Sequence, residues 1–202
     1  MVKQHIVLAF GWVIFCLLHS LLASIRVKKE VAKRSGIFFK YYRLYYTVFA
    51  FVSFAAIIIY QLALSSLYIF SPNAISDTTG VILSTIGLAI MLVCIKKYFG
   101  NLSGLKTLFI DEYETGNKLV VTGIHRYVRH PLYGGTFLFI WGLFILMPYG
   151  SLLVSNLIIT CYTLIGIGFE EQKLLREFGQ AYEEYKKKVP KIIPSLKPSP
   201  SN

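Results

Sequence analysis

Two blocks of ionisable residues flank one apolar helical hairpin in the second half of the chain. The first block reads Gly-Ile-His-Arg-Tyr-Val-Arg-His-Pro-Leu-Tyr over residues 123–133. The second block begins with Glu170-Glu171, where the next apolar segment ends. Ionisable groups beside hydrocarbon are costly unless they bind one another or a ligand. The pattern therefore predicts an active site at a membrane surface.

The first block has the chemistry to bind an anionic group. Pro131 suits the first position of a helix, so the amides that follow His130 would lie at the positive end of a helix dipole. Arg129 adds a planar set of donors that matches a carboxylate, and Tyr133 follows within one turn. Each residue alone would also serve as an anchor at the lipid headgroups. Their combination favours a polar ligand.

The adjacent carboxylates Glu170 and Glu171 have two explanations. They repel each other, so they would normally spread into water at a solvated helix start. Alternatively, one of them binds a cation, either Arg129 across the hairpin or a ligand with an ammonium or sulfonium group. The sequence leaves both explanations open.

The composition predicts an all-α, polytopic integral membrane protein. Of the 202 residues, 55% are hydrophobic and 15% are charged, whereas soluble domains carry about 25% charged residues. Five segments are apolar enough to cross a bilayer, and the last two form a C-terminal helical hairpin: residues 5–25, 45–70, 80–95, 131–147 and 152–169. An amphipathic cytoplasmic helix is expected over 170–188, weakened by Gly179 and ended before Pro190.

The basic residues predict which side of the membrane each segment faces. With five spans, Lys3 lies on one side and the other 20 of the 21 basic residues lie on the opposite side, which is the cytoplasmic side by the positive-inside rule. We therefore expect an outside N-terminus, a cytoplasmic C-terminus and a cytoplasmic site. One membrane domain is expected over 1–194, with three spans in 1–100, a ligand-binding loop, hairpin and helix in 101–194, and a disordered tail over 195–202.

The positions of the charged residues and cysteines indicate which classes of ligand and partner the protein is expected to bind. The net charge of +11 comes from basic residues beside the spans, which favours membrane lipids over nucleic acid. Cys16, Cys94 and Cys161 lie within apolar segments at no metal-ligand spacing, so neither a metal site nor a disulfide is expected. His19, inside the first span with Ser20, is expected either to bind a neighbouring helix or to line a cavity.

Several ordered motifs resemble the isoprenylcysteine carboxyl methyltransferase family. The resemblance covers about residues 117–194 and rests on Leu119-Val120-x-x-Gly123, Arg129-His130-Pro131-x-Tyr133, Glu170-Glu171, Phe178-Gly179-x-x-Tyr182-x-x-Tyr185 and Val189-Pro190. Residues 18–23 and 42–44 more closely resemble bacterial relatives such as the membrane methanethiol methyltransferases and NnrU-like proteins. The resemblance implies a methyltransferase of the bacterial inner membrane that uses S-adenosylmethionine.

The resemblance also implies which residues form the site. Cofactor contacts would come from Asn117, Lys118, Leu119, Val120, His125, His130, Pro131, Leu132, Tyr133 and Glu170. Position 125 is often Tyr in the family, so His125 leaves that contact open. Methyl transfer needs alignment of the reacting groups and exclusion of water. Arg129 is the first candidate for orienting the reacting groups, and Glu171 is the second.

One departure from the family bears on the methyl acceptor. The eukaryotic prenylcysteine enzymes have an Arg one turn before the first Glu, associated with the substrate carboxylate, whereas this chain has Gly166. A small thiol, a lipid or another apolar acceptor is therefore as credible as an isoprenylcysteine-like carboxylate. Gly166 and Gly168 would give room for a substrate or for close helix packing.

Two other functions remain open from the sequence. Membrane sterol reductases, which use NADPH, are similar at Arg-His-Pro-x-Tyr and at the terminal tyrosine pattern. A non-catalytic membrane protein with the same fold is the third possibility. The Glu170-Glu171 pair and the short loop before the hairpin favour the methyltransferase, and ligand binding would separate the three.

Overall fold

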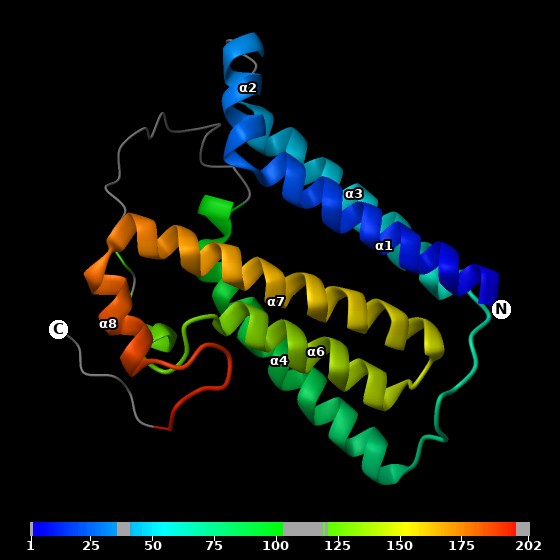
Figure 1. The fold of residues 1–202 in the computed structure, drawn as a ribbon. Coiled ribbons are helices and arrows are strands. Elements are labelled where there is room, and N and C mark those ends of the chain that lie inside the picture. The colour runs from blue at the N-terminus through cyan, green and yellow to red at the C-terminus, as the bar shows by residue number, and fades with distance from the viewer. Residues whose placement is uncertain (1, 36–40, 103–118, 120, 197–202) are drawn as a thin grey trace. The chain divides into compact units, whose positions relative to one another are not determined.

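The computed structural model describes residues 2–35, 41–102, 119 and 121–196. All regular structure in these residues is helical, without a strand (Figure 1). Four helices are long and apolar enough to cross a membrane: α1 (Val2–Ala23), α3 (Tyr42–Ala63), α4 (Ala74–Leu102) and α7 (Gly150–Phe178). A fifth apolar helix, α6 (Pro131–Leu146), is shorter. The predicted class, an all-α polytopic membrane protein, is confirmed.

The helices divide between two compact units. The first unit contains α1, α3, the basic helix α2 (Ile25–Ser35) and the first turns of α7. The second contains most of α4, the short 3-10 helix η2 (Gly123–Arg126), α6, the rest of α7, and α8 (Gln180–Lys188). The single domain expected for residues 1–194 stays a prediction. Most of the expected tail, residues 197–202, lies outside the described residues.

Polar side chains join the helices of the first unit. Trp12 Nε1 of α1 donates to Ser155 Oγ of α7 at 2.7 Å, and Ser155 Oγ donates to Gln61 Oε1 of α3 at 2.5 Å. The His19 ring of α1 is 3.0 Å from the Tyr46 hydroxyl of α3. The expected hydrogen bond from His19 to a neighbouring helix is confirmed. Such bonds hold helices together where no water competes.

Glycines bring the backbones of α4 and α6 together in the second unit (Figure 1). A Cβ built on Gly87 would lie 2.6 Å from the Gly135 carbonyl oxygen, and one on Gly142 would lie 2.5 Å from the Ser84 nitrogen. No side chain fits in these positions, and small residues at such contacts allow helices to pack closely in membranes. The contact fixes α6, whose first residues belong to the polar block.

Replacing Gly87 by alanine is expected to destabilise the second unit by about 1–3 kcal/mol, because the added methyl group overpacks a backbone contact. Thermal unfolding in detergent measures the change. Gly166→Ala is the matched control, because a Cβ there meets nothing within 4 Å in the described part of the chain. Equal effects of the two substitutions would contradict the proposed role of the contact.

The same observation describes the surroundings of Gly166 and Gly168. Close helix packing was one of their two expected uses, but neither glycine has a heavy atom of another described residue within 4 Å of a built Cβ. Both glycines therefore leave open space beside α7 in the described part of the chain.

Two predicted helix boundaries are wrong. The second span ends at Ala63 instead of residue 70. The third helix begins at Ala74 instead of residue 80, because the Asn73 side chain accepts hydrogen bonds from the amides of Ile75 at 2.9 Å and Ser76 at 3.0 Å. An Asn at this position satisfies amides that have no partner within the helix.

The expected helix over 170–188 is also not a separate element. The hairpin forms as predicted, and Trp141 Nε1 of α6 donates to Thr160 Oγ1 of α7 at 3.1 Å. However, α7 continues through Glu170-Glu171 to Phe178, because Glu, Gln, Lys, Leu and Arg favour helix. The break comes at Gly179, with φ +53, and α8 follows it. The change to polar residues marks the end of the apolar part of α7, not the end of the helix.

Candidate functional site

The segment that follows α8 returns to the start of α6. We call residues 189–196 the C-terminal segment. The Arg129 amide donates to the Pro190 carbonyl at 2.9 Å, the His130 amide to the Lys191 carbonyl at 3.0 Å, and the Ser195 amide to the Tyr127 carbonyl at 2.9 Å. Pro131 is the first residue of α6, as predicted. The backbone therefore brings Arg129 and His130 beside residues about 60 positions later.

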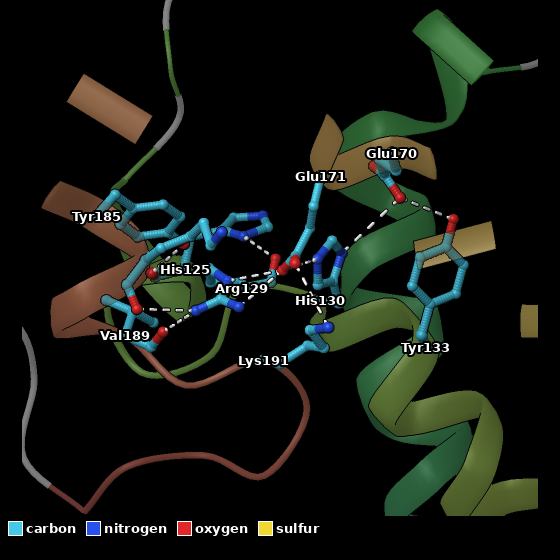
Figure 2. A network of polar contacts seen from close by, with 10 residues as sticks. His125, Arg129, His130, Tyr133, Glu170, Glu171, Tyr185, Val189 and Lys191 are labelled. Carbon is cyan, nitrogen blue, oxygen red and sulfur yellow. Dashed lines mark hydrogen bonds and ion pairs between the residues drawn. The ribbon is translucent and has the colours of Figure 1, made fainter. Parts of the chain in front are cut away.

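Arg129 connects three parts of the second unit (Figure 2). Its guanidinium donates to Glu171 Oε1 of α7 from Nη2 at 2.7 Å and from Nε at 3.0 Å. Nη1 donates to the Lys186 carbonyl at 3.0 Å and to the Val189 carbonyl at 2.5 Å. The Arg129 and Glu171 side chains are 8% and 11% exposed. This buried arrangement, the Arg129–Glu171 pair, holds α7, the end of α8 and the C-terminal segment together.

Two further nitrogen-bearing side chains face the Glu171 carboxylate. His130 Nε2 donates to Oε1 at 3.2 Å, and Lys191 Nζ lies 3.4 Å from Oε2. A buried carboxylate without such partners would carry a large desolvation cost. Lys191 was not predicted, because only the folded chain brings it to Glu171. The surroundings indicate that Glu171 positions other groups.

Glu170 has different surroundings from its neighbour. The Tyr133 hydroxyl donates to Glu170 Oε2 at 3.1 Å, and His130 Nδ1 lies 3.8 Å from the same oxygen. The Glu170 side chain is 44% exposed, and the His130 ring stacks on Tyr133 with a centroid distance of 5.7 Å. Of the two open explanations, cation binding holds for Glu171, whereas the exposed Glu170 side chain fits either explanation. Glu171 binds Arg129, and Glu170 has a carboxylate accessible to a ligand cation.

A cavity of about 310 Å³ lies between these elements of the second unit. Its lining combines both signs of charge with apolar and aromatic groups: Leu119, His125, Arg129, His130, Glu170, Lys173, Leu174, Glu177, Phe178, Tyr182 and Tyr185. The arrangement suits a ligand that carries an ammonium, a carboxylate and an apolar ring.

The structure brings together most of the predicted residues that it describes. Leu119, His125, Arg129, His130 and Glu170 line the cavity, and Tyr133 contacts Glu170. Three expected contacts lie outside the described residues: Asn117, Lys118 and Val120.

Four predicted residues that the structure describes do not line this cavity: Pro131, Leu132, Tyr133 and Glu171. Pro131 lines a separate apolar cavity of about 680 Å³ between α4, α6 and the C-terminal segment. Leu132 lines neither of the two cavities. Val128 and Pro131 line the apolar cavity, whereas Arg129 and His130 line the polar one. Within residues 128–131, the two outer residues therefore line the apolar cavity and the two inner residues line the polar one.

Four lining residues on α7 were not predicted as site residues. They follow Glu170 at spacings of three, four, seven and eight: Lys173, Leu174, Glu177 and Phe178. This spacing places them on the same face of a helix. The expected helix over 170–188 already contains Glu170 and these four residues, so their shared face could have been found in the sequence.

Two tyrosines of α8 complete the lining. The Tyr185 hydroxyl donates to the His125 carbonyl at 2.7 Å, and the His125 Nδ1 donates in turn to the Arg129 carbonyl at 3.2 Å. Tyr182 is 1% exposed. Burial raises the pKa of Tyr182 to about 12, and the negative charge of Glu171 contributes to the rise. The Tyr182 hydroxyl therefore stays protonated at neutral pH and can donate a hydrogen bond.

A family comparison gives a match over most of the elements that form the site, but it ends before Tyr182, Tyr185 and the C-terminal segment. The family model described as phospholipid methyltransferase matches residues 75–181. The match includes α4, the Arg129-His130 segment, α6 and α7.

Curated relatives match shorter segments. Methanethiol S-methyltransferase of Crocosphaera subtropica is 37% identical over 90 residues, 44% of this chain and 34% of that protein. Methanethiol S-methyltransferase 2 of Bradyrhizobium diazoefficiens is 35% identical over 99 residues, covering 48% and 38%. Protein-S-isoprenylcysteine O-methyltransferase of Schizosaccharomyces pombe is 44% identical over 81 residues, covering 39% and 34%. Each match spans little more than a third of the relative. No solved structure matches the chain.

Proposed function

Because the chain belongs to the phospholipid methyltransferase family, we propose that it is an S-adenosylmethionine-dependent integral membrane methyltransferase. The observation that supports this best is the polar cavity, which carries an accessible carboxylate, Glu170, beside the cations and aromatic groups of α7 and α8. When bound, the cofactor supplies a methyl group on a sulfonium, together with an ammonium and a carboxylate for recognition.

The residues present fit that cofactor. Glu170 is accessible from the cavity and would bind the ammonium through charge-assisted hydrogen bonds. Lys173 lines the cavity one turn further along α7 and would bind the carboxylate. The start of α6, where no side chain caps the helix, adds amide donors near His130.

Arg129 and Glu171 contribute by positioning. The Arg129 donors bind Glu171 and two carbonyl groups, so the guanidinium has little freedom to follow a reacting group. The pair fixes His130 and the C-terminal segment around the cavity. A rigid cavity lining would hold the reacting groups in line and exclude water. Methyl transfer requires both of the protein.

For the acceptor we propose a small thiol, or a lipid or isoprenylcysteine-like group. The relatives are named for methanethiol and for protein isoprenylcysteine. Position 166, where the resemblance placed a carboxylate-binding Arg, is a glycine with open space around it, which favours an acceptor without a carboxylate. We place the site at the cytoplasmic side of a bacterial inner membrane.

Calorimetric titration of the detergent-purified chain with S-adenosylhomocysteine, the demethylated cofactor, tests the proposal. We expect saturable binding of this ligand and none of NADPH. Binding of NADPH alone would assign the chain to a reductase, and binding of neither would favour a non-catalytic protein. After the expected result, a screen of thiols and lipids with a methyl-labelled donor would identify the acceptor.

A further inference from the structure

The Tyr182 hydroxyl is a buried polar group without a protein partner. Among the described residues, it makes no hydrogen bond although its oxygen is inaccessible to water. Nearly all buried polar groups in proteins are hydrogen-bonded, and one without a partner carries a desolvation cost. Tyr185, one turn along α8, has its bond to the His125 carbonyl. The unbonded hydroxyl of Tyr182 therefore requires an explanation. Because Tyr182 lines the polar cavity, a ligand in that cavity is the first candidate for the missing partner.

The surroundings of Tyr182 restrict what can accept its hydrogen bond. Tyr182 forms a buried cluster with Tyr185 and Val189, against which Leu119, Leu174 and Phe178 pack. The last three also line the cavity. This part of the lining is apolar and suits a flat, uncharged ring. Glu171 contributes negative charge at this hydroxyl and Arg129 contributes positive charge, so an uncharged acceptor meets neither repulsion nor competition with the Arg129–Glu171 pair.

We propose that the Tyr182 hydroxyl donates a hydrogen bond to a ring nitrogen of a purine held against Leu119, Leu174 and Phe178. Under the proposed function, on which this inference rests, the purine is the adenine of the cofactor. Tyr182 thereby selects an adenine-bearing donor: a ring without an acceptor nitrogen would leave the hydroxyl buried and unbonded.

The test compares Tyr182→Phe with the wild-type chain in titrations with S-adenosylhomocysteine. The variant is expected to bind about three- to tenfold more weakly, as for the loss of one neutral hydrogen bond. Its unfolding temperature without ligand should not fall, because no protein hydrogen bond is lost. Tyr60→Phe of α3, whose hydroxyl makes a long 3.5 Å contact to the Gln4 carbonyl, is the control and should bind as the wild type does.

Analogues of S-adenosylhomocysteine with a carbon in place of one adenine nitrogen identify the acceptor. Among the 1-, 3- and 7-deaza forms, one should bind the wild type more weakly, and Tyr182→Phe should show no further loss with that form. Equal affinity of Tyr182→Phe and wild type for S-adenosylhomocysteine would overturn the inference. So would a fall in unfolding temperature that accounts for the weaker binding. Failure of the wild type to bind would instead refute the proposed function.

Discussion

Replacing Arg129 by alanine is expected to lower the free energy of unfolding by about 3–5 kcal/mol, the usual cost of removing one partner of a buried ion pair. The substitution leaves the Glu171 carboxylate, with an 11% exposed side chain, without its closest cation. It also removes the donors to the Lys186 and Val189 carbonyls. Thermal unfolding in detergent measures the loss of stability. Proteolysis directed at the C-terminal segment measures how far that segment is released.

The chain contains a matched control for this experiment. Arg34 and Glu30 form an ion pair with the same 2.7 Å distance, but their side chains are 78% and 52% exposed. Arg34→Ala is expected to change stability by less than about 0.5 kcal/mol, because water screens exposed pairs on a helix. A similarly small effect of Arg129→Ala would show that the buried pair does not hold the C-terminal segment in place.

Neutralising Glu170 is expected to weaken binding of S-adenosylhomocysteine by about 10- to 100-fold, the range for a charge-assisted hydrogen bond. Glu170→Gln keeps the shape of the side chain and removes the charge that would bind the ammonium. Its 44% exposure means that the fold should tolerate the change. His130→Ala has the larger expected effect and should abolish binding, because it removes the ring that stacks on Tyr133 and bonds to Glu171. Calorimetry measures the affinities, and circular dichroism confirms folding.

Glu184→Gln, an exposed position on α8, controls for the change in net charge. It should bind the ligand with wild-type affinity. Unchanged affinity in both Glu170→Gln and His130→Ala would reject the assignment of the cavity as the cofactor site. Loss of binding in the control as well would indicate a long-range effect of charge rather than a contact.

The parts of the site that depend on neighbouring residues in the chain could be predicted from the sequence. Pro131 at the first position of α6 and the hairpin that begins there both follow from short-range preferences. The resemblance identified Arg129, His130 and Glu170, which the structure brings together.

Local sequence patterns do not encode contacts between residues that are distant in the chain. Lys191 faces Glu171 only because the C-terminal segment returns to α6, and no periodicity encodes that path. The close approach of Gly87 to Gly135 similarly depends on how two helices pack. The helix break assigned to Glu170 was an error of another kind. Polarity changes where hydrocarbon ends, whereas a helix ends where backbone conformation changes, here at Gly179.

The return of the C-terminal segment also has a consequence for biosynthesis. The Pro190 and Lys191 carbonyls accept the amides of Arg129 and His130, yet they are made about 60 residues later and after every apolar helix of the described chain. Proteins form their earlier parts first during translation. The cavity therefore cannot be complete while α7 is being inserted. A nascent chain should complete this cavity only after Pro190 and Lys191 have left the ribosome.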